Sequence, residues 1–355
     1  MKVAVYPADL GGCGHYRLIW ACRALAHEGF DVELHEPDAA GNAPWVAVLR
    51  DGHDGPHLVD LVLPPNADVV VLQRPLRRLM AEAVEVLQAK GVVVVVEIDD
   101  DFAAMSPANV AWLACQPKKS PTRNLRHLAR ACAAADWVTV STPALARRYG
   151  AHGRCSVIPN YVPRRYLDVR RWRGEPSVVW SGELSTHPHD LQQVGAGVRQ
   201  AFDATGASLR VVGSGEGVPR ALGVAGGTAC GWQPIDDYPV MLAQASVGIV
   251  PLELTAFNQA KSWLKGLELA AVGVPFVASP TQQYEALAAD GIGVLAAKPK
   301  HWRASLVGLL NDVDRCEEMG EDQRRYVAAR YVLEDHLDEW PAAWAAAARN
   351  RLAVA

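Results

Sequence analysis

Residues 92–98 read "VVVVVEI", a nearly unbroken run of β-branched side chains. Such runs are typical of strands covered on both faces in a parallel sheet, because a face open to water would alternate polar residues with apolar ones. Amphipathic helical patterns, such as residues 15–29 and 75–91, lie between similar runs at "KVAVYP" (2–7), "DVELHE" (31–36), "DVVVLQ" (68–73) and "WVTVST" (137–142). The first half of the chain is therefore predicted to be a doubly wound α/β domain.

The pattern breaks at residues 163–176, which are rich in proline and arginine, and then restarts. Later strands are predicted at "SVVWSGE" (177–183), "SLRVVGSG" (208–215), "VGIVPLE" (247–253), "PFVAS" (275–279) and "GIGVLAA" (291–297). A chain of 355 residues also exceeds one typical core. We therefore expect two Rossmann-like, doubly wound parallel-sheet domains that face each other across a cleft, residues 1–165 and 176–332, and a helical tail, 333–355, that packs back on the first domain.

The composition is that of a globular protein, with 50% hydrophobic residues and a net charge of −4. No apolar run is long enough to predict a membrane span, and the N-terminus lacks the layout of a secretory signal. The 7 cysteines are scattered without a CxxC spacing, which favours a reduced, cytoplasmic protein. The charge argues against a surface built for nucleic acid, although the basic segments 116–130 and 163–173 fit either a phosphate-rich partner or solvated faces.

Ligands of open α/β sheets bind beyond the carboxyl ends of the strands, so functional side chains are expected directly after each strand. In "YPADLGGCGHYR" (6–17), Gly12 would let the backbone approach a phosphate, and a helix begins near His15. A purely structural tight turn fits equally well. In "WSGELSTHPHDL" (180–191) we expect Asp190 to cap the next helix, and the histidines fit surface positions as well as a site.

Three consecutive aspartates follow a strand in "VEIDDDFAAM" (96–105). A helix N-cap with acids in the first turn explains them. Alternatively, Asp99 and Asp100 form a polar cluster that holds an acceptor hydroxyl or a basic side chain, since structure alone would not favour such crowded charges. Nothing else in the sequence completes a metal shell, so no metal site is predicted.

The segment "FNQAKSWLKGLELAAVGVPFVAS" (257–279) carries Lys261, Lys265 and Glu268 in an otherwise apolar helix. At about 3.6 residues per turn these positions share one face, which fits a solvated salt-bridge face or a ligand site. In the second interpretation the helix starts near Ser262, and its free amides and the two lysines neutralise a diphosphate. Glu268, deeper in the helix, then accepts the hydroxyl protons of a ribose.

Four segments are informative together: "STPALARRY" (141–149), "VIPN" (157–160), "LRVVGSG" (209–215) and, most specifically, "LELAAVGVPFVAS" (267–279). They resemble segments of GT-B glycosyltransferases of the family-4 type, and "FNQAKSWLKGLE" and "EIDDDF" look like a divergent subgroup that includes phage-encoded enzymes. The resemblance implies two Rossmann-like domains and a sugar nucleotide held mainly by the C-terminal one. It further implies transfer that usually proceeds with retention and without an essential metal.

By position, the resemblance implies that Glu268 binds the donor ribose and that the turn at Gly12 approaches the diphosphate and sugar. This sequence departs from the family at two places. The glutamate usually found eight positions before Glu268 is Ala260, and histidines replace the basic residue after the first strand of the second domain. We expect Lys261 and Lys265 to neutralise the diphosphate instead.

The predicted function is transfer of a sugar from a UDP- or GDP-sugar to a hydroxyl-bearing acceptor, with no other cofactor. The expected residues are Gly12, Gly182, Gly213, Lys261, Ser262, Lys265 and Glu268 for the donor, Trp232 and Gln233 for the nucleobase, and His15, Asp99 and Asp100 for the acceptor. A DNA base, a protein, a glycan and a small molecule stay open as acceptors. The alternatives are a sugar-nucleotide epimerase and a non-catalytic module that binds nucleotides or nucleic acid.

Overall fold

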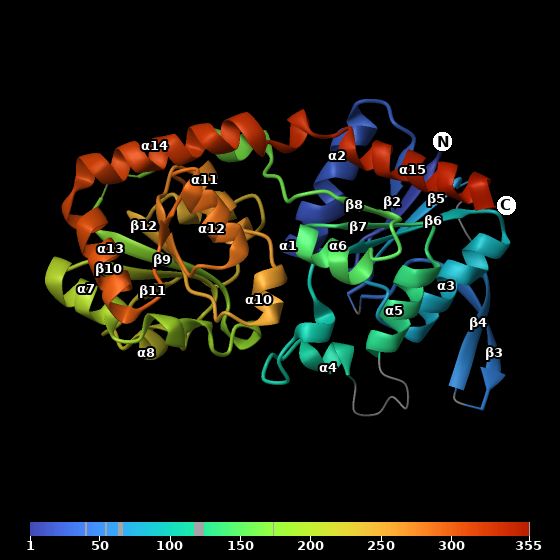
Figure 1. The fold of residues 1–355 in the computed structure, drawn as a ribbon, viewed down its shortest axis with the longest axis horizontal. Coiled ribbons are helices and arrows are strands. Elements are labelled where there is room, and N and C mark those ends of the chain that lie inside the picture. The colour runs from blue at the N-terminus through green and yellow to red at the C-terminus, as the bar shows by residue number, and fades with distance from the viewer. Residues whose placement is uncertain (40, 54, 63–66, 117–123, 173, 355) are drawn as a thin grey trace. The chain divides into compact units, whose positions relative to one another are not determined.

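The computed structural model (Figure 1) describes residues 1–39, 41–53, 55–62, 67–116, 124–172 and 174–354. The chain forms two compact units. Unit 1 comprises Met1–Pro107, Ala111–Asn160 and Glu334–Ala355, and unit 2 comprises Ala108–Val110 and Tyr161–Leu333. The chain passes from one unit to the other at Asn160, a few residues before the predicted linker.

Unit 1 is built on a six-stranded parallel sheet with the strand order β2-β1-β5-β6-β7-β8. The strands are β1 (Val3–Tyr6), β2 (Val32–Leu34), β5 (Val69–Gln73), β6 (Val93–Ile98), β7 (Trp137–Val140) and β8 (Cys155–Val157). The valine run lies in the central strand β6, where Val94, Val95 and Val96 are each 0% exposed. The prediction of a parallel sheet buried on both faces is confirmed.

Helices lie on both faces of this sheet, with α2 and α15 above it and α3 and α5 below it in Figure 1. The helical elements are α1 (Gly12–Gly14), the π-helical turn η1 (His15–Ile19), α2 (Trp20–His27), α3 (Arg78–Ala89), η2 (Phe102–Ala104), α4 (Trp112–Cys115), α5 (Asn124–Ala134), α6 (Pro143–Tyr149) and α15 (Glu339–Val354). The C-terminal helix α15 packs against β6 and β7. A separate antiparallel hairpin pairs β3 (Val46–Gly52) with β4 (Gly55–Val62).

Unit 2 repeats this architecture with the strand order β11-β10-β9-β12-β13-β14, again all parallel. The strands are β9 (Ser177–Glu183), β10 (Ser208–Ser214), β11 (Thr228–Ala229), β12 (Val247–Val250), β13 (Phe276–Ala278) and β14 (Val294–Leu295). Apolar residues of β9, β10 and β12 pack with Trp302 in one buried core. Two doubly wound parallel sheets are thus present, as predicted from the alternating pattern.

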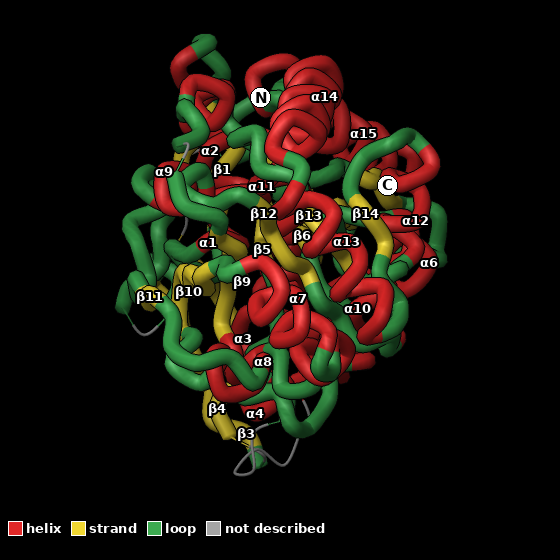
Figure 2. Tube along the Cα trace, turned by 90° about the vertical axis from the view of Figure 1, so that its left-hand side faces the viewer, coloured by secondary structure: helices red, strands yellow, loops and turns green. Residues whose placement is uncertain are grey.

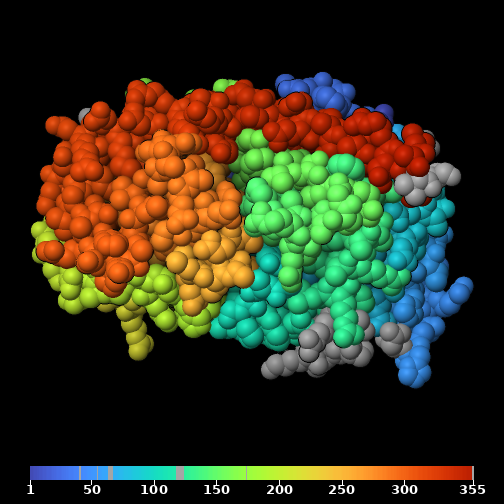
Figure 3. Space-filling view, in the orientation of Figure 1, coloured from blue at the N-terminus to red at the C-terminus, as the bar shows by residue number. Residues whose placement is uncertain are grey.

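The helices of unit 2 surround its sheet. They are α7 (Gly197–Thr205), α8 (Val218–Leu222), α9 (Tyr238–Leu242), α10 (Ala256–Ala260), α11 (Leu264–Ala271), α12 (Gln282–Ala289), α13 (Pro299–Asn311) and α14 (Val313–Arg330), with the short turns η3 (Arg164–Asp168), η4 (Leu184–Thr186) and η5 (Asp190–Val194). Helices α7 and α13 pack side by side (Figure 2), and α14 forms part of the outer surface of this unit (Figure 3). No described helix is both long and apolar enough to cross a membrane.

Candidate functional site

Polar side chains gather at the carboxyl ends of the strands of unit 2, where ligands of α/β sheets bind. Lys265, near the start of α11, points across the end of β9, and its ammonium lies 5.4 Å from the centroid of the Trp180 ring. Gly182 leaves the room for it, because a Cβ at this position would lie 2.8 Å from the Lys265 Nζ. Gly182 also has a φ of +139°, which disfavours any larger residue.

Gly213, the other glycine predicted for this site, ends β10 beside Gly182. Its N–H donates to the carbonyl oxygen of Gly231 at 2.8 Å. A Cβ at Gly213 would lie 2.3 Å from the carbonyl oxygen of Gly182. The two glycines therefore allow the ends of β9 and β10 and the loop at Gly231 to approach one another closely.

Glu268 lies on α11 and is only 5% exposed. The hydroxyl oxygen of Tyr238 lies 3.0 Å from its Oε2 and 3.0 Å from the Oγ of Ser181. Burial, with the charge of Glu268 as the next cause, raises the pKa of Tyr238 well above its usual value, so the phenol stays protonated. The interpretation of Lys265 and Glu268 as a solvated salt-bridge face is thus wrong, because the carboxylate lies inside unit 2 and is hydrogen-bonded there.

Lys265 is half-buried, and burial lowers its pKa to about 8. The nearby Asp190 and Glu268 oppose this shift, whereas the positive charge of Lys261 adds to it. Among the residues that the structure describes, no hydrogen bond or salt bridge engages the ammonium group of Lys265. A half-buried cation that lies against an aromatic ring is suited to an anionic ligand.

The helix begins two residues after the start predicted near Ser262, so Ser262 and Lys261 lie outside it. Helix α10 ends at Ala260, Lys261 has an extended backbone with a ψ of 150°, and α11 begins at Leu264 with Trp263 at its N-cap. The Nζ of Lys261 lies 4.3 Å from the centroid of the Phe257 ring. Lys261 and Lys265 therefore do not share a helix face, although their charges act on each other.

Asp190 does not cap a helix, and this prediction is also wrong. Its Oδ2 lies 2.6 Å from the Nδ1 of His187, and its Oδ1 accepts the N–H of Glu253 and the side-chain amide of Asn258, both at 2.8 Å. The carboxylate thus ties the end of β9 to the loop after β12 and to α10. Burial, followed by the charge of Lys265, lowers the pKa of His187 to about 4, so its ring is neutral near neutral pH.

The predicted nucleobase residues lie in the loop that follows β11. Trp232 is 66% exposed, and its side chain is close enough to Glu183, at the end of β9, to help lower the pKa of that carboxyl. The side-chain amide of Gln233 donates to the carbonyl oxygen of Cys230. Trp232 therefore presents an open aromatic surface next to the strand ends, whereas Gln233 shapes the loop itself.

In unit 1, Gly12 begins the first helical turn, and a Cβ there would meet nothing within 4 Å. Gly14 has no such room, because a Cβ would lie 1.9 Å from the carbonyl oxygen of Asp9. The Oδ1 of Asp9 accepts the N–H groups of Gly11 and Gly14 at 2.9 and 3.1 Å. His15 is buried with its Nδ1 2.9 Å from the Gly11 carbonyl oxygen, so Nδ1 carries the proton and Nε2 is left as the acceptor.

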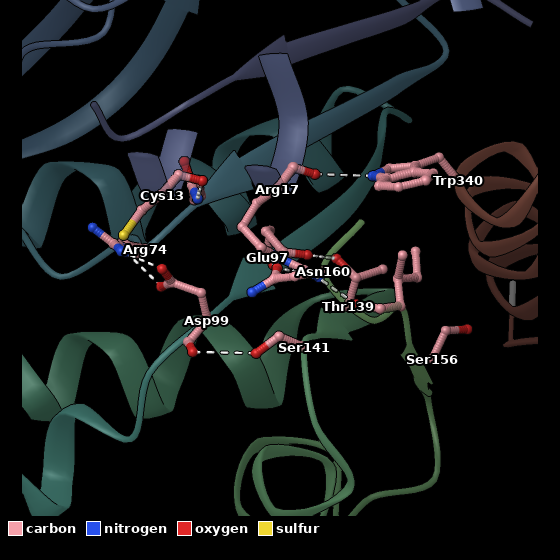
Figure 4. Close-up of polar contacts among 12 residues, drawn as sticks. Cys13, Arg17, Arg74, Glu97, Asp99, Thr139, Ser141, Ser156, Asn160 and Trp340 are labelled. Carbon is pink, nitrogen blue, oxygen red and sulfur yellow. Dashed lines mark hydrogen bonds and ion pairs between the residues drawn. The ribbon is translucent and has the colours of Figure 1, made fainter. Parts of the chain in front are cut away.

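Asp99 is held by an arginine that the sequence analysis did not identify (Figure 4). The Nε of Arg74 lies 2.6 Å from the Asp99 Oδ1, and its Nη1 lies 3.0 Å from the Oδ2 of Asp9. Burial acts to raise the pKa of Asp99, but the charge and hydrogen bonds of Arg74, with smaller contributions from Cys13 and Arg17, together outweigh it, and the pKa falls to about 2. Asp99 is therefore a poor general base. Of the two roles predicted for this aspartate, it holds a basic side chain, Arg74, rather than an acceptor hydroxyl.

The other two aspartates of the run lie in different surroundings. Asp100 is half-buried. Asp101 stands at the N-cap of η2 without a side-chain cap bond, and its Oδ1 lies 3.3 Å from the Tyr149 hydroxyl and 3.6 Å from the Nε of Arg148. The N-cap explanation of the run is thus wrong. Among the described residues, no cluster of histidine, cysteine and acidic side chains has the geometry to hold a metal ion.

A second buried ion pair lies deeper in unit 1. The Nε of Arg17 is 2.7 Å from the Oε1 of Glu97, and its Nη1 donates to the Asn160 Oδ1 at 2.9 Å (Figure 4). Thr139 also donates to Glu97, and the indole of Trp340 donates to the Arg17 carbonyl oxygen at 3.0 Å. Arg17 thus links η1 to β6 and α15 directly, and to β7 through Glu97.

The basic segments are only partly described. Residues 117–123 and 173 lie outside the described residues. In the remainder, Arg130 pairs with Glu85 at 2.5 Å, Arg165 pairs with Asp236 at 2.6 Å, and Arg171 donates to the Ser246 carbonyl oxygen at 2.6 Å. These arginines therefore make contacts within their own units.

Sequence reasoning missed Tyr238, Ser181, Asn258 and Arg74. Tyr238 is the last residue of the loop "CGWQPIDDY" (230–238), which contains the predicted nucleobase residues Trp232 and Gln233. The sequence therefore indicated the loop but not the contact between Tyr238 and Glu268. Arg74 has a φ of +50°, which is uncommon for a residue other than glycine. This unusual backbone conformation cannot be read from the sequence.

Residues 175–312 match the family described as Glycosyl transferases group 1. A comparison with curated proteins gives no match. Among solved structures, sucrose-phosphate synthase from Thermosynechococcus elongatus has a TM-score of 0.65 at 17% identity, over 100% of each chain. HepE of Anabaena in complex with UDP has a TM-score of 0.61 at 14% identity, over 96% of this chain and 98% of that one.

A glycosyltransferase from Rickettsia africae has a TM-score of 0.67 at 11% identity, over 98% of this chain and 99% of that one. TarM is longer: the chain spans 54% of its length, with a TM-score of 0.55. These likenesses establish the fold, and the family match adds the domain in unit 2. The chain thus has the GT-B fold seen in glycosyltransferases, and residues 175–312 match the group 1 glycosyl transferase family, which together support a glycosyltransferase.

Proposed function

We propose that the protein transfers a sugar from a nucleoside-diphosphate sugar to a hydroxyl-bearing acceptor, with retention at the sugar carbon and without an essential metal. The observation that carries this proposal is the pairing of Lys265 with Glu268 on one turn of α11. The first presents a half-buried cation, and the second presents a buried carboxylate oriented by Tyr238. We assign the cation to the diphosphate and the carboxylate to the ribose hydroxyls.

The chemical barrier is the departure of the nucleoside diphosphate, on which negative charge grows as the bond to the sugar breaks. A preorganised cation stabilises that charge more in a desolvated site than in water, commonly by a few kcal/mol. We assign this role to Lys265, with Lys261 and the backbone near Ser262 as further contacts. Gly182 leaves room for the Lys265 side chain, Gly213 lets the ends of β9 and β10 approach closely, and Trp232 offers its exposed ring to the base.

On the acceptor side, we propose that His15 or Asp100 contacts the attacking hydroxyl and that Gly12 approaches the sugar. His15 qualifies because its Nδ1 is committed to the Gly11 carbonyl oxygen, which leaves Nε2 able to accept a proton. Asp99 is engaged by Arg74, and we assign it no direct contact with the acceptor. The structure of the Anabaena relative contains UDP, which supports a UDP-sugar as the first donor to test. The resemblance to phage-type enzymes stays a prediction, and the acceptor is unassigned.

The test is a thermal-shift and turnover assay with UDP-, GDP- and other nucleotide sugars. A ligand that binds only the folded protein raises its melting temperature. We expect one nucleotide to stabilise the wild type and Lys265→Ala to abolish the shift, whereas Lys300→Ala, an exposed lysine of α13, leaves it unchanged. Release of nucleoside diphosphate in the presence of EDTA would support metal independence.

Two results would contradict the proposal. One is the absence of stabilisation by every nucleotide tested. The other is conversion of a sugar nucleotide into its epimer without any acceptor, which would favour the epimerase. Identification of the sugar-bearing product with a labelled donor then distinguishes a protein, glycan, DNA or small-molecule acceptor.

A further inference from the structure

His187 stands at the carboxyl end of β9, between η4 and η5, next to the lysines of unit 2. The Nδ1 of its ring lies 2.6 Å from the Oδ2 of Asp190. Because an ionised carboxylate only accepts hydrogen bonds, Nδ1 carries the proton of the neutral ring. The Nε2 atom is then the nitrogen that can take up a second proton.

The ring is held in this orientation by a fixed partner. Asp190 is 4% exposed, and its Oδ1 accepts the N–H of Glu253 and the side-chain amide of Asn258, both at 2.8 Å. The side chain of His187 itself is 13% exposed. The Asp190 carboxylate, held by these donors, fixes the orientation of the His187 ring. A buried aspartate orients the imidazole of catalytic histidines in the same way.

The charged groups around His187 come from α11, the segment before it, and η5. Lys265 of α11 and Lys261, which precedes it, both oppose an imidazolium, whereas Asp190 of η5 favours one. Burial and Lys265 outweigh Asp190, so the pKa of His187 falls to about 4. The free protein therefore holds a neutral histidine next to two lysines. The balance depends on charge, so an anion placed among these groups will change it.

We propose that His187 is a further diphosphate-binding residue, which takes up a proton from solvent when the nucleotide sugar binds. This inference rests on the proposed function of the same site. The diphosphate brings two negative charges to Lys265 and Lys261 and so removes the repulsion that keeps His187 neutral. The buffer loses one proton, Nε2 gains it, and no bond of the ligand breaks. The resulting imidazolium donates its Nε2–H to a phosphate oxygen and supplies a third cation.

The experiment is titration calorimetry of the full chain with UDP-glucose, and with other nucleotide sugars, in two buffers of different ionisation enthalpy. Their diphosphate esters have no group that titrates near neutral pH, so proton uptake reports the protein. At about pH 6.5 Lys265 is already protonated, because its pKa is about 8, and uptake by this lysine is excluded. We expect the wild type to take up more than half a proton per ligand and to bind more weakly as the pH rises.

His187→Gln keeps an amide N–H for Asp190 but cannot be protonated, and we expect it to bind about tenfold more weakly with no proton uptake. The matched control is His189→Gln, a half-buried histidine whose ring contacts Gln192, which should behave as the wild type. Binding by the wild type without uptake, or uptake that persists in His187→Gln, overturns the inference but leaves the proposed function intact. Failure of every nucleotide sugar to bind overturns both.

A direct measurement covers the case in which His187→Gln does not fold. In ¹⁵N-histidine NMR spectra of the wild type, the Nε2 resonance of His187 should move from the unprotonated to the protonated range when the nucleotide sugar is added. A resonance that stays in the unprotonated range at saturation contradicts the inference.

Discussion

The hydroxyl oxygen of Tyr238 lies 3.0 Å from the Oε2 of Glu268, and this contact joins the start of α9 to the middle of α11. The same hydroxyl lies 3.0 Å from the Oγ of Ser181 on β9. Three elements thus fix one buried carboxylate, which is the group proposed to bind the ribose. A carboxylate held in one orientation binds a diol at a lower entropic cost than a mobile one.

Replacing Tyr238 by phenylalanine removes this contact without changing the ring. We expect Tyr238→Phe to raise the dissociation constant of the nucleotide about tenfold, since a hydrogen bond to a charged group contributes roughly 1.5–3 kcal/mol. Calorimetry with the nucleotide identified by thermal shift provides the measurement. Tyr284→Phe is the control, because that buried hydroxyl contacts the Gly266 N–H rather than Glu268. Equal losses in both variants would show that Tyr238 has only a general structural role.

Gly182→Ala tests the room left for Lys265. The added Cβ would lie 2.8 Å from the Lys265 Nζ, and the φ of +139° disfavours alanine, so the ammonium must move. We expect loss of nucleotide binding together with a destabilisation of about 1–3 kcal/mol. Gly206→Ala shares the positive φ, +68°, but its Cβ would meet nothing within 4 Å. That control should lower stability alone, and a comparable loss of binding in it would refute the role of Gly182.

The sequence predicted what depends on local pattern. The valine runs indicated both parallel sheets, and the spacing of Lys265 and Glu268 held because both residues lie within α11. The predicted helical spacing failed for Lys261, because helix α10 ends just before this residue. Trp263, which follows, packs against Tyr331 with ring centroids 5.1 Å apart.

Contacts between distant segments could not be predicted in the same way. Asp190 accepts a hydrogen bond from Asn258, which lies 68 residues away in the sequence. The local sequence around Asp190 resembles a helix N-cap and gives no indication of this distant contact. Arg74 likewise meets Asp9 and Asp99 only because parallel strands end at one edge of the sheet. Such groups are fixed by topology, which a single sequence indicates only in outline.

Gly14→Ala tests the turn of unit 1 that Asp9 holds. The new Cβ would lie 1.9 Å from the Asp9 carbonyl oxygen, a backbone atom that cannot move freely. We expect a destabilisation of about 1–3 kcal/mol and a lower yield of folded protein. Gly12→Ala, whose Cβ has open space, should unfold like the wild type. Thermal denaturation followed by circular dichroism distinguishes the two, and equal melting temperatures would contradict the geometry of the turn.

The ion pair between Arg74 and Asp99 predicts a dependence of stability on acid. Because the pKa of Asp99 falls from 3.8 to about 2 in the folded state, the folded protein holds the charged form more strongly than the unfolded chain does. The resulting stability is complete above about pH 4 and is lost as the pH falls toward 2, by about 2 kcal/mol in all.

Hydrogen exchange of amides in β5 and β6 measures this loss within unit 1. In Asp99→Asn these amides should be less protected at neutral pH, and the decrease between pH 4 and 2 should be smaller. Asp31→Asn, at an exposed position of the same unit, should retain the wild-type profile. An unchanged acid profile in Asp99→Asn would mean that Arg74 does not hold this carboxylate in its charged form.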